Sequence, residues 1–172
     1  GIGISLQDNS TDNILVRNSA KKNYNGIELT RGCQRNAVYG NNITDNTNGV
    51  RVDKNYNNLI YHNNFFKNTI SAYDNYTHNF WNTTVGNYYS DYRGADANGD
   101  GLGDEPYRIP KGSSDAQDSK PLISPCDTSS FDVAAIRADV ERYAIYVQED
   151  DQPYQVVGGA IVIKSQARKS PP

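Results

Sequence analysis

The residues whose chemistry is easiest to name lie between Asp96 and Asp104. Side chains with oxygen atoms recur there at the first, third, fifth and ninth positions of a loop, and a glycine stands at the sixth, where EF-hand loops turn sharply. The backbone carbonyl of the seventh residue supplies another oxygen in such loops, and Ca²⁺ prefers oxygen ligands. The spacing therefore predicts a structural Ca²⁺ site with Asp96, Asn98, Asp100, Leu102 and Asp104 as ligands.

The twelfth position of this loop is Tyr107, where an EF-hand has a bidentate glutamate. A strict EF-hand is therefore excluded, and the missing ligand must come from water or from Glu105, Asp91 or Asp118. The alternative is a solvated turn without a metal. We favour the metal site, because acidic and amide groups at alternate positions would repel one another without a cation.

A pair of carboxylates on one face of a fold could support glycoside hydrolysis. Asp53 and Asp74 occupy matching places in successive repeats of the sequence, and three basic residues lie near them: Arg31, Arg51 and Lys54. The alternative is an ordinary solvated face. His62 and His78 fall at different repeat positions, without a nucleophile beside them. We therefore expect no catalytic residues and a protein that is not an enzyme.

Exposed tyrosines are a second candidate for binding chemistry. Tyr39 and Tyr61 share one position in successive repeats, so they should lie side by side as a stripe. A tyrosine ring with a polar tip suits a wet surface that stacks on sugar rings. The alternative is that the two rings only stabilise neighbouring repeats. The sequence leaves a carbohydrate-binding module as the second functional hypothesis.

Two cysteines and four sequons bear on the compartment. Cys33 and Cys126 are expected to form a disulfide if the chain is extracellular, which would close a long loop. The Asn-x-Ser/Thr sequons are predicted glycosylation sites in that compartment. They begin at Asn9, Asn42, Asn75 and Asn82. Together with the calcium chemistry, these features favour an extracellular or cell-surface protein.

Short motifs recur along the first half of the chain. Gly3-Ile-Ser-Leu6 returns as Gly26-Ile-Glu-Leu29 and Gly49-Val-Arg-Val52, with a spacing of 23 residues each time. A second motif with asparagine at both ends covers 13–18, 36–41, 58–63 and, more weakly, 79–82. A period of this length is typical of repeat proteins, whose units are stable only when they are stacked.

Each repeat contains about three short apolar pieces with period-two alternation, which indicates half-buried strands. Stacked repeats would align the apolar residues in columns, and asparagine at the corners tolerates positive φ and can form an amide ladder. A Greek-key β-domain is the alternative, but its strands would not repeat their sequence. The predicted columns are Ile4/Ile27/Val50, Leu6/Leu29/Val52, Leu15/Val38/Ile60/Trp81 and Ile43/Phe65, and the predicted ladder is Asn13/Asn36/Asn58/Asn79.

These motifs resemble the PbH1 repeats of NosD-like β-helix proteins. The stretches 86–92, 96–104, 106–110 and 118–122 resemble the segment that closes such helices in archaeal surface proteins. The resemblance covers about residues 1–123 and implies a right-handed parallel β-helix, export, and frequent association with carbohydrate or the cell envelope. NosD proteins are also associated with copper-enzyme maturation. We do not expect a copper role, because the chain has no methionine among the soft ligands that copper favours.

The composition excludes some classes of function. The net charge is −3 and the basic residues do not cluster, so no nucleic-acid surface is expected. No apolar run is long enough to cross a bilayer. The hydrophobic content is only 36%, which is little for a conventional core. The polarity comes largely from asparagine, which is absent after residue 98.

The C-terminal part of the chain, which contains no asparagine, is predicted to be an appendage to the rungs. Ser129 and Asp132 suggest a helix start, and apolar residues at three-four spacing predict a helix over 131–143. A β-hairpin is expected from 143–148 and 154–164, with a turn at 150–153. Its apolar strand 160–163 would be hazardous if uncovered, and the first repeat has no capping segment before it. Both features predict self-association, and the alternative is that earlier rungs are missing from the chain.

The sequence as a whole predicts an all-β, right-handed, single-stranded parallel β-helix of about four rungs. The expected divisions are 1–85 for the rungs, 86–123 for the closing segment with the Ca²⁺ loop, and 124–172 for the appendage. The expected function is a non-catalytic structural protein of the cell surface, stabilised by Ca²⁺ and self-associating. The alternative is a carbohydrate-binding module or a fragment of a polysaccharide-acting enzyme.

Overall fold

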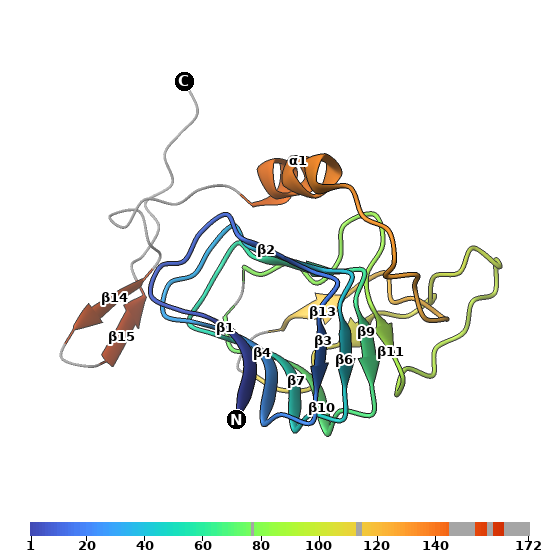
Figure 1. The fold of residues 1–172 in the computed structure, drawn as a ribbon, viewed down its shortest axis with the longest axis horizontal. Coiled ribbons are helices and arrows are strands. Elements are labelled where there is room, and N and C mark those ends of the chain that lie inside the picture. Colours follow the sequence, from blue (N-terminus) through green and yellow to red (C-terminus); the bar gives the residue numbers. More distant parts are fainter. Residues whose placement is uncertain (77, 113–114, 145–153, 158–159, 164–172) are drawn as a thin grey trace.

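The computed structural model describes residues 1–76, 78–112, 115–144, 154–157 and 160–163, the last two segments as backbone only. The chain coils through three parallel sheets, and each of the first three turns adds one strand to each sheet (Figure 1). The predicted parallel β-helix of about four rungs is therefore confirmed. The handedness of the coil stays a prediction.

Each sheet contains strands that lie about one repeat apart in sequence. The first sheet has the order β1 (Ile2–Leu6), β4 (Asn25–Thr30), β7 (Asn48–Asp53) and β10 (Ile70–Asp74). The second has β2 (Ile14–Val16), β5 (Ala37–Tyr39) and β8 (Leu59–Tyr61). The third has β3 (Ser19–Lys21), β6 (Asn42–Thr44), β9 (Asn64–Phe66) and β11 (Tyr88–Tyr89).

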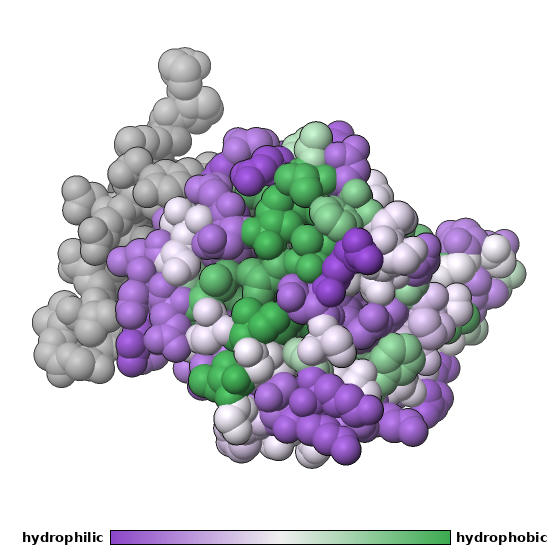
Figure 2. Space-filling model, in the orientation of Figure 1, coloured by the Kyte–Doolittle hydropathy of each residue, from purple (hydrophilic) through white to green (hydrophobic). Residues whose placement is uncertain are grey.

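The interior consists of the predicted apolar columns. Ile27 pairs with Val50 and Leu29 with Val52 across β4 and β7, and all four side chains are fully buried. The third and fourth columns are also present, and Ala20 and Tyr89 extend the column of Ile43. In the first rung, Ile4 and Leu6 are only partly buried, and apolar surface shows between its strands (Figure 2). The spacing of apolar residues in the sequence thus determines what fills the solenoid.

A glycine near the start of three of the first-sheet strands allows the rungs to approach closely. A Cβ atom on Gly26 would lie 2.6 Å from the carbonyl oxygen of Gly49, and one on Gly3 would lie 2.6 Å from that of Gly26. Real Cβ atoms do not come this close to an oxygen. The recurring glycine is therefore a packing requirement of the stacked strands.

Asparagine amides link the rungs at the corners. The predicted ladder is confirmed: the Oδ1 atom of Asn36 accepts from the backbone N–H and the Nδ2 of Asn13, both at 3.0 Å. Asn36 donates in the same double manner to Asn58, and Asn58 to Asn79. A second ladder runs through Asn18, Asn41, Asn63 and Asn87, and a third through Asn23, Asn46 and Asn68.

The ladder asparagines do not themselves adopt positive φ, contrary to the expectation from the sequence. The residue before nine of the eleven does so instead, for example Arg35 (φ 56°) before Asn36 and His62 (φ 57°) before Asn63. Nine corners of the ladders are therefore formed by left-handed residues of several types. The asparagine is needed for its amide, and the corner conformation is supplied by its neighbour.

Two ladders end on buried carboxylates. Asn87 donates its backbone N–H and its Nδ2 to Asp118 Oδ2 at 2.7 and 3.2 Å, and Asn79 Nδ2 donates to Asp74 Oδ1 at 3.2 Å. Both aspartates have a relative exposure of 0%. A carboxylate accepts hydrogen bonds without requiring a further acceptor, so it is suited to the last position of such a ladder.

The closing segment covers the last rung. Its short strands β12 (Tyr107–Arg108) and β13 (Gln117–Asp118) pair antiparallel, and Lys111 O accepts from the backbone N–H of Asp74 at 2.9 Å. The Tyr107 ring stacks on Tyr89 with centroids 3.7 Å apart, and Tyr89 stacks on Phe65 at 5.0 Å. The tyrosines thus continue the apolar column beyond the rungs.

The appendage contains the predicted helix. Helix α1 (Val133–Tyr143) begins after Asp132, whose carboxylate accepts from the backbone N–H groups of Ala134 and Ala135. Strands β14 (Tyr154–Val157) and β15 (Ala160–Ile163) form an antiparallel hairpin. The strand expected from residue 143 is wrong at its start, because Tyr143 ends the helix, and residues 145–153 with the expected turn lie outside the described residues.

Replacing a central ladder residue should destabilise the whole solenoid. Asn58→Ala removes the acceptor of Asn36 and the donors to Asn79, so buried amides lose partners, and the free energy of unfolding should fall by about 2–4 kcal/mol. Urea unfolding followed by circular dichroism measures the change. Gln117→Ala, which changes an exposed amide on β13, is the control and should change stability by less than about 0.5 kcal/mol. Equal effects would contradict the role of the ladder.

Candidate functional site

The outer face of the first sheet carries charged and polar side chains. Register places Ser5, Glu28, Arg51 and Tyr73 side by side on β1, β4, β7 and β10. Sequence reasoning overlooked Glu28, although it stands at the same repeat position as Arg51. Residues at the same repeat position lie side by side on adjacent strands, so the sequence could have placed Glu28 next to Arg51.

Arg51 holds the two carboxylates of this face. Its Nη1 lies 3.1 Å from Glu28 Oε1, and its Nη2 lies 2.5 Å from Asp53 Oδ2. Its guanidinium carbon is 4.9 Å from the centre of the Tyr73 ring, a cation–π contact. Asn25 Nδ2 also donates to Glu28 Oε1 at 2.9 Å. The network fixes both acidic side chains against the sheet.

An open cleft lies beside this network, with a volume of about 300 Å³. Glu28 is 7% exposed, so its carboxylate forms the inner wall. Lys54 is exposed at the rim and follows β7 in a left-handed corner conformation (φ 59°). The described residues that line the cleft are all polar: Gln7, Glu28, Thr30, Arg31, Asp53 and Lys54.

The structure does not bring the sequence-predicted carboxylate pair together on this face. Asp74 pairs in register with Val52, so it continues the inward column of Leu6 and Leu29. It accepts from Trp81 Nε1 at 2.9 Å. The pairing of Asp53 with Asp74 is wrong by one residue, and a shift of one residue along a strand moves a side chain to the other face.

The outer face of the second sheet is covered by α1 (Figure 1). Ile136 and Val140 pack there against Ala37, Leu59 and Tyr61. The Tyr61 hydroxyl donates to Asp139 Oδ2 at 2.7 Å, and Tyr61 is 3% exposed. The expected open stripe of Tyr39 and Tyr61 is therefore wrong, because helix α1 packs on Tyr61 and covers its ring.

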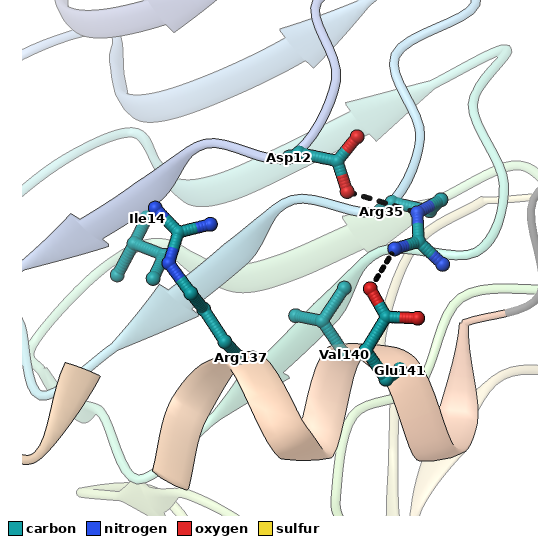
Figure 3. A pocket seen from close by; sticks show the side chains of 6 residues that line it. All are labelled: Asp12, Ile14, Arg35, Arg137, Val140 and Glu141. Atoms are coloured by element: carbon teal, nitrogen blue, oxygen red, sulfur yellow. Dashed lines mark hydrogen bonds and ion pairs between the residues drawn. The ribbon is translucent and has the colours of Figure 1, made fainter. Parts of the chain in front are cut away.

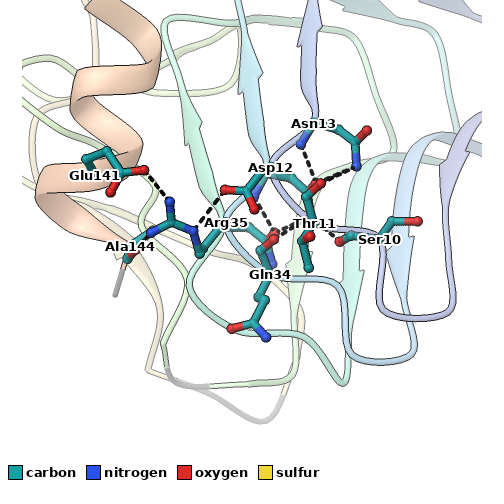
Figure 4. Close-up of polar contacts among 10 residues, drawn as sticks. Ser10, Thr11, Asp12, Asn13, Gln34, Arg35, Glu141 and Ala144 are labelled. Atoms are coloured by element: carbon teal, nitrogen blue, oxygen red, sulfur yellow. Dashed lines mark hydrogen bonds and ion pairs between the residues drawn. The ribbon is translucent and has the colours of Figure 1, made fainter. Parts of the chain in front are cut away.

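Arg35 fastens the helix to the solenoid. Its Nε donates to Asp12 Oδ1 at 2.9 Å, its Nη1 donates to Ala144 O at 2.7 Å, and its Nη2 pairs with Glu141 (Figures 3 and 4). The pocket beside it, between α1 and β2, has a volume of only about 50 Å³. This junction is a structural contact with little room for a ligand.

The acidic loop uses its carboxylates on its own backbone. Asp96 accepts from the N–H groups of Gly99, Asp100 and Gly101 at 2.8–3.1 Å, and Asp104 Oδ2 accepts from Ala97 at 2.9 Å. In the described part of the chain, no three or more His, Cys, Asp or Glu side chains are grouped to hold a metal. Calcium binding by this loop thus stays a prediction.

Two of the residues expected to complete the calcium site have other roles. Asp118 ends an asparagine ladder, and Asp91 accepts hydrogen bonds from Tyr107 and Ser71. Asp91 Oδ2 lies 3.0 Å from the Tyr107 hydroxyl, and Asp118 is fully buried. Neither is placed as a ligand of the loop.

Cys33 and Cys126 are both free, so the expected disulfide is not formed in this structure. Cys33 is buried inside the solenoid, where its thiol donates to Thr30 O at 3.2 Å. Cys126 lies outside the third sheet, where Asn64 holds its backbone N–H and carbonyl, both at 2.9 Å. The two thiols lie on different sides of the sheet, so a disulfide would need rearrangement.

The four sequon asparagines differ in exposure. Asn9 is exposed, whereas the other three are half-buried. Asn42 donates to Thr128 Oγ1 at 3.0 Å, Asn75 accepts from Lys54 N at 3.0 Å, and Asn82 accepts from Ser119 N at 3.0 Å. Asn9 is therefore the most accessible of the four for a glycan.

A family model described as "Periplasmic copper-binding protein (NosD)" matches residues 1–94, which are the four rungs and the start of the closing segment. The chain belongs to the NosD family. None of the curated proteins matches it. The description places NosD proteins in the periplasm, outside the cytoplasm, and names a binding protein rather than an enzyme. No helix in the described part of the chain is long and apolar enough to cross a membrane.

The copper site implied by the NosD description does not fit the residues present. Cys33 is enclosed in the core, and the His62 ring stacks on Tyr39 at 5.0 Å. The chain has no methionine, and the described residues contain no metal-binding group of three. Cys126 approaches His62 only at its backbone carbonyl, 3.2 Å away. The described part of this NosD chain therefore lacks the convergent soft ligands that copper requires.

The buried ladder carboxylates should make stability depend on pH. Burial raises the pKa of Asp74 and of Asp118 to about 6 each, although N–H donors oppose the rise. Between about pH 4 and pH 6 the folded chain holds more protons than the unfolded chain. The free energy of unfolding should thus fall as pH rises through this range, by up to about 3 kcal/mol per residue, and then level off.

Urea unfolding at several pH values tests this expectation. Asp118→Asn and Asp74→Asn should each remove part of the decrease, since the amide does not titrate. Asp45→Asn, which changes an exposed carboxylate paired with Lys21 at 3.8 Å, is the control and should keep the slope. If the fall in stability with pH were unchanged in both Asp118→Asn and Asp74→Asn, Asp74 and Asp118 would not be its cause.

Proposed function

We propose that this NosD-family chain is a non-catalytic structural protein of the cell surface. The observation that carries the proposal is the use of its polar residues. Eleven asparagines form the three ladders between rungs, and two of these ladders end on aspartates. Asp74 and Asp118, which the sequence suggested for a carboxylate pair and for the calcium site, thus serve to hold the coil together.

The proposal of a non-catalytic role also rests on the cleft. Glycoside hydrolysis needs one carboxyl group that donates a proton and a second that acts as base or nucleophile. Here Arg51 is paired with both Glu28 and Asp53, and Asp74 faces the interior. No histidine lines the cleft to replace either role.

Several finer features belong to this proposal. The coil is right-handed, with rungs over 1–85, a closing segment over 86–123 and an appendage over 124–172. Asn9 carries a glycan, and the acidic loop binds Ca²⁺ between Asp96 and Asp104. The chain self-associates or contacts other envelope components, because β15 has the sequence Ala-Ile-Val-Ile, which would be adhesive at a sheet edge.

Size-exclusion chromatography and negative-stain imaging test the structural role, with Ca²⁺ and with excess chelator. The proposal expects ordered assemblies in Ca²⁺ that dissociate in chelator, because the loop braces the segment that closes the solenoid. Asp96→Ala should abolish the difference, whereas Asp45→Ala should not. A monomer in both conditions would contradict self-association, and an unchanged thermal unfolding midpoint with Ca²⁺ would contradict the metal site.

A reducing-end assay on plant and bacterial polysaccharides tests the absence of catalysis. Release by the unaltered chain that is lost in Asp53→Asn and kept in Asp45→Asn would overturn the non-catalytic role. Equal background in all three preparations is the expected result.

A further inference from the structure

We propose that two copies of the chain exchange the segment that carries α1, so that the helix of each copy covers the second sheet of the other. The proposal rests on the self-association proposed above, and it names the surfaces that meet. The segment consists of residues 124–132, which we call the strap, and of α1 itself. The strap leaves the closing segment and runs outside the coil to the helix (Figure 1).

Side chains of the third sheet hold the strap by its backbone. Asn64 Oδ1 accepts from the N–H of Cys126, and Asn64 Nδ2 donates to the carbonyl oxygen of Cys126, both at 2.9 Å. One rung earlier, Asn42 Nδ2 donates to Thr128 Oγ1 at 3.0 Å. The strap therefore crosses the sheet from β9 to β6, and it forms no strand of its own. These contacts require an extended strap, and a strap from another copy satisfies them equally well.

The helix is fastened to the rungs at few points. Two residues of α1 are buried, Ile136 and Val140, and they pack against the second sheet. Its described hydrogen bonds to the rungs come from Arg35 and Tyr61. Each of these contacts joins residues 124–144 to the rungs, so each is retained when a second copy supplies the segment. Exchange of an identical element therefore costs little free energy.

The covered surface defines the partner that it fits. It takes an extended backbone at Asn64 on the third sheet. On the second sheet it takes a pair of apolar side chains four residues apart in a helix, with an acidic residue between them that accepts from the Tyr61 hydroxyl. Residues 124–144 have these features in the required order, and a second copy carries the same residues. A second copy is therefore the partner.

The start of the strap favours exchange over closure within one copy. Proline fixes its own φ and restricts the residue before it to extended conformations, so Ser124-Pro125 forms a stiff hinge. A short hinge under such constraint favours exchange. Of the five large apolar side chains that are exposed in the described part of the chain, three lie at or beside the ends of the strap: Ile123, Phe131 and Val133. In an exchanged pair the two straps pass each other, and these side chains gain a surface on which to pack.

Disulfide trapping distinguishes exchange from closure. Asn42→Cys and Thr128→Cys place one thiol on the sheet and one on the strap, at side chains that are in contact. The chain also carries Cys126→Ser, which keeps a donor for His62 O. It is oxidised at a concentration at which the unaltered chain assembles, and it is then separated in denaturant without reductant. The expected result is covalent dimers, because each strap lies on the other copy, and the chain with Asn42→Cys but without Thr128→Cys is the control that should give none.

The outcomes separate this proposal from the one on which it rests. Assembly of the unaltered chain, with disulfides formed only within single chains, would overturn the exchange and leave self-association in place. An unaltered chain that stays a monomer at every concentration would overturn both.

A second variant tests the hinge and leaves the contacts of the strap in place. Pro125→Ala changes an exposed residue and relaxes the hinge, so the dissociation constant of the pair should rise about fivefold. Pro110→Ala, which changes an exposed proline of the closing segment, is the matched control and should leave the constant unchanged. Analytical ultracentrifugation of the full chain measures the three constants. Equal constants in all three chains would contradict exchange through this hinge.

Discussion

The asparagine amide at each corner is the interaction on which the rest of this structure depends. One asparagine, such as Asn63, accepts twice at its Oδ1 from the rung before it and donates its backbone N–H and its Nδ2 to the rung after it. Such a bond forms only when equivalent residues of successive rungs are aligned. The ladders therefore set the register of all three sheets, and the apolar columns follow from that register because strand side chains alternate between faces.

Fixed register makes each outer face a set of repeated rows with its own character. The first sheet presents Glu28 beside Arg51, a charged row next to an open cleft. The second presents Ala37 beside Leu59, an apolar row that α1 covers. The third presents Asn42 beside Asn64, and the latter holds the segment leading to α1. The same coil thus offers three surfaces for different contacts.

The repeat could be read from the sequence because it depends on spacing alone. The columns and the ladder from Asn13 to Asn79 were predicted for this reason. Asp74 was misplaced because its match with Asp53 assumed a step of 21 residues, whereas β7 and β10 pair with a step of 22, as Val52 opposite Asp74 shows. Helix α1 covers Tyr61, and the hydroxyl of Tyr61 donates to Asp139 of this helix, 78 residues away in the sequence. No local pattern in the sequence indicates such a contact.

The ladders have a direction, and direction gives the solenoid an electrical polarity. Every amide in a ladder points its oxygen toward the previous rung, so the small amide dipoles add along the axis, as peptide dipoles do in an α-helix. Their positive ends meet at Asn79 and Asn87, where Asp74 and Asp118 accept the last bonds. An anion at this end is favoured as an acidic residue is favoured in the first turn of a helix. The coil therefore has two chemically unlike ends, although its rungs are alike.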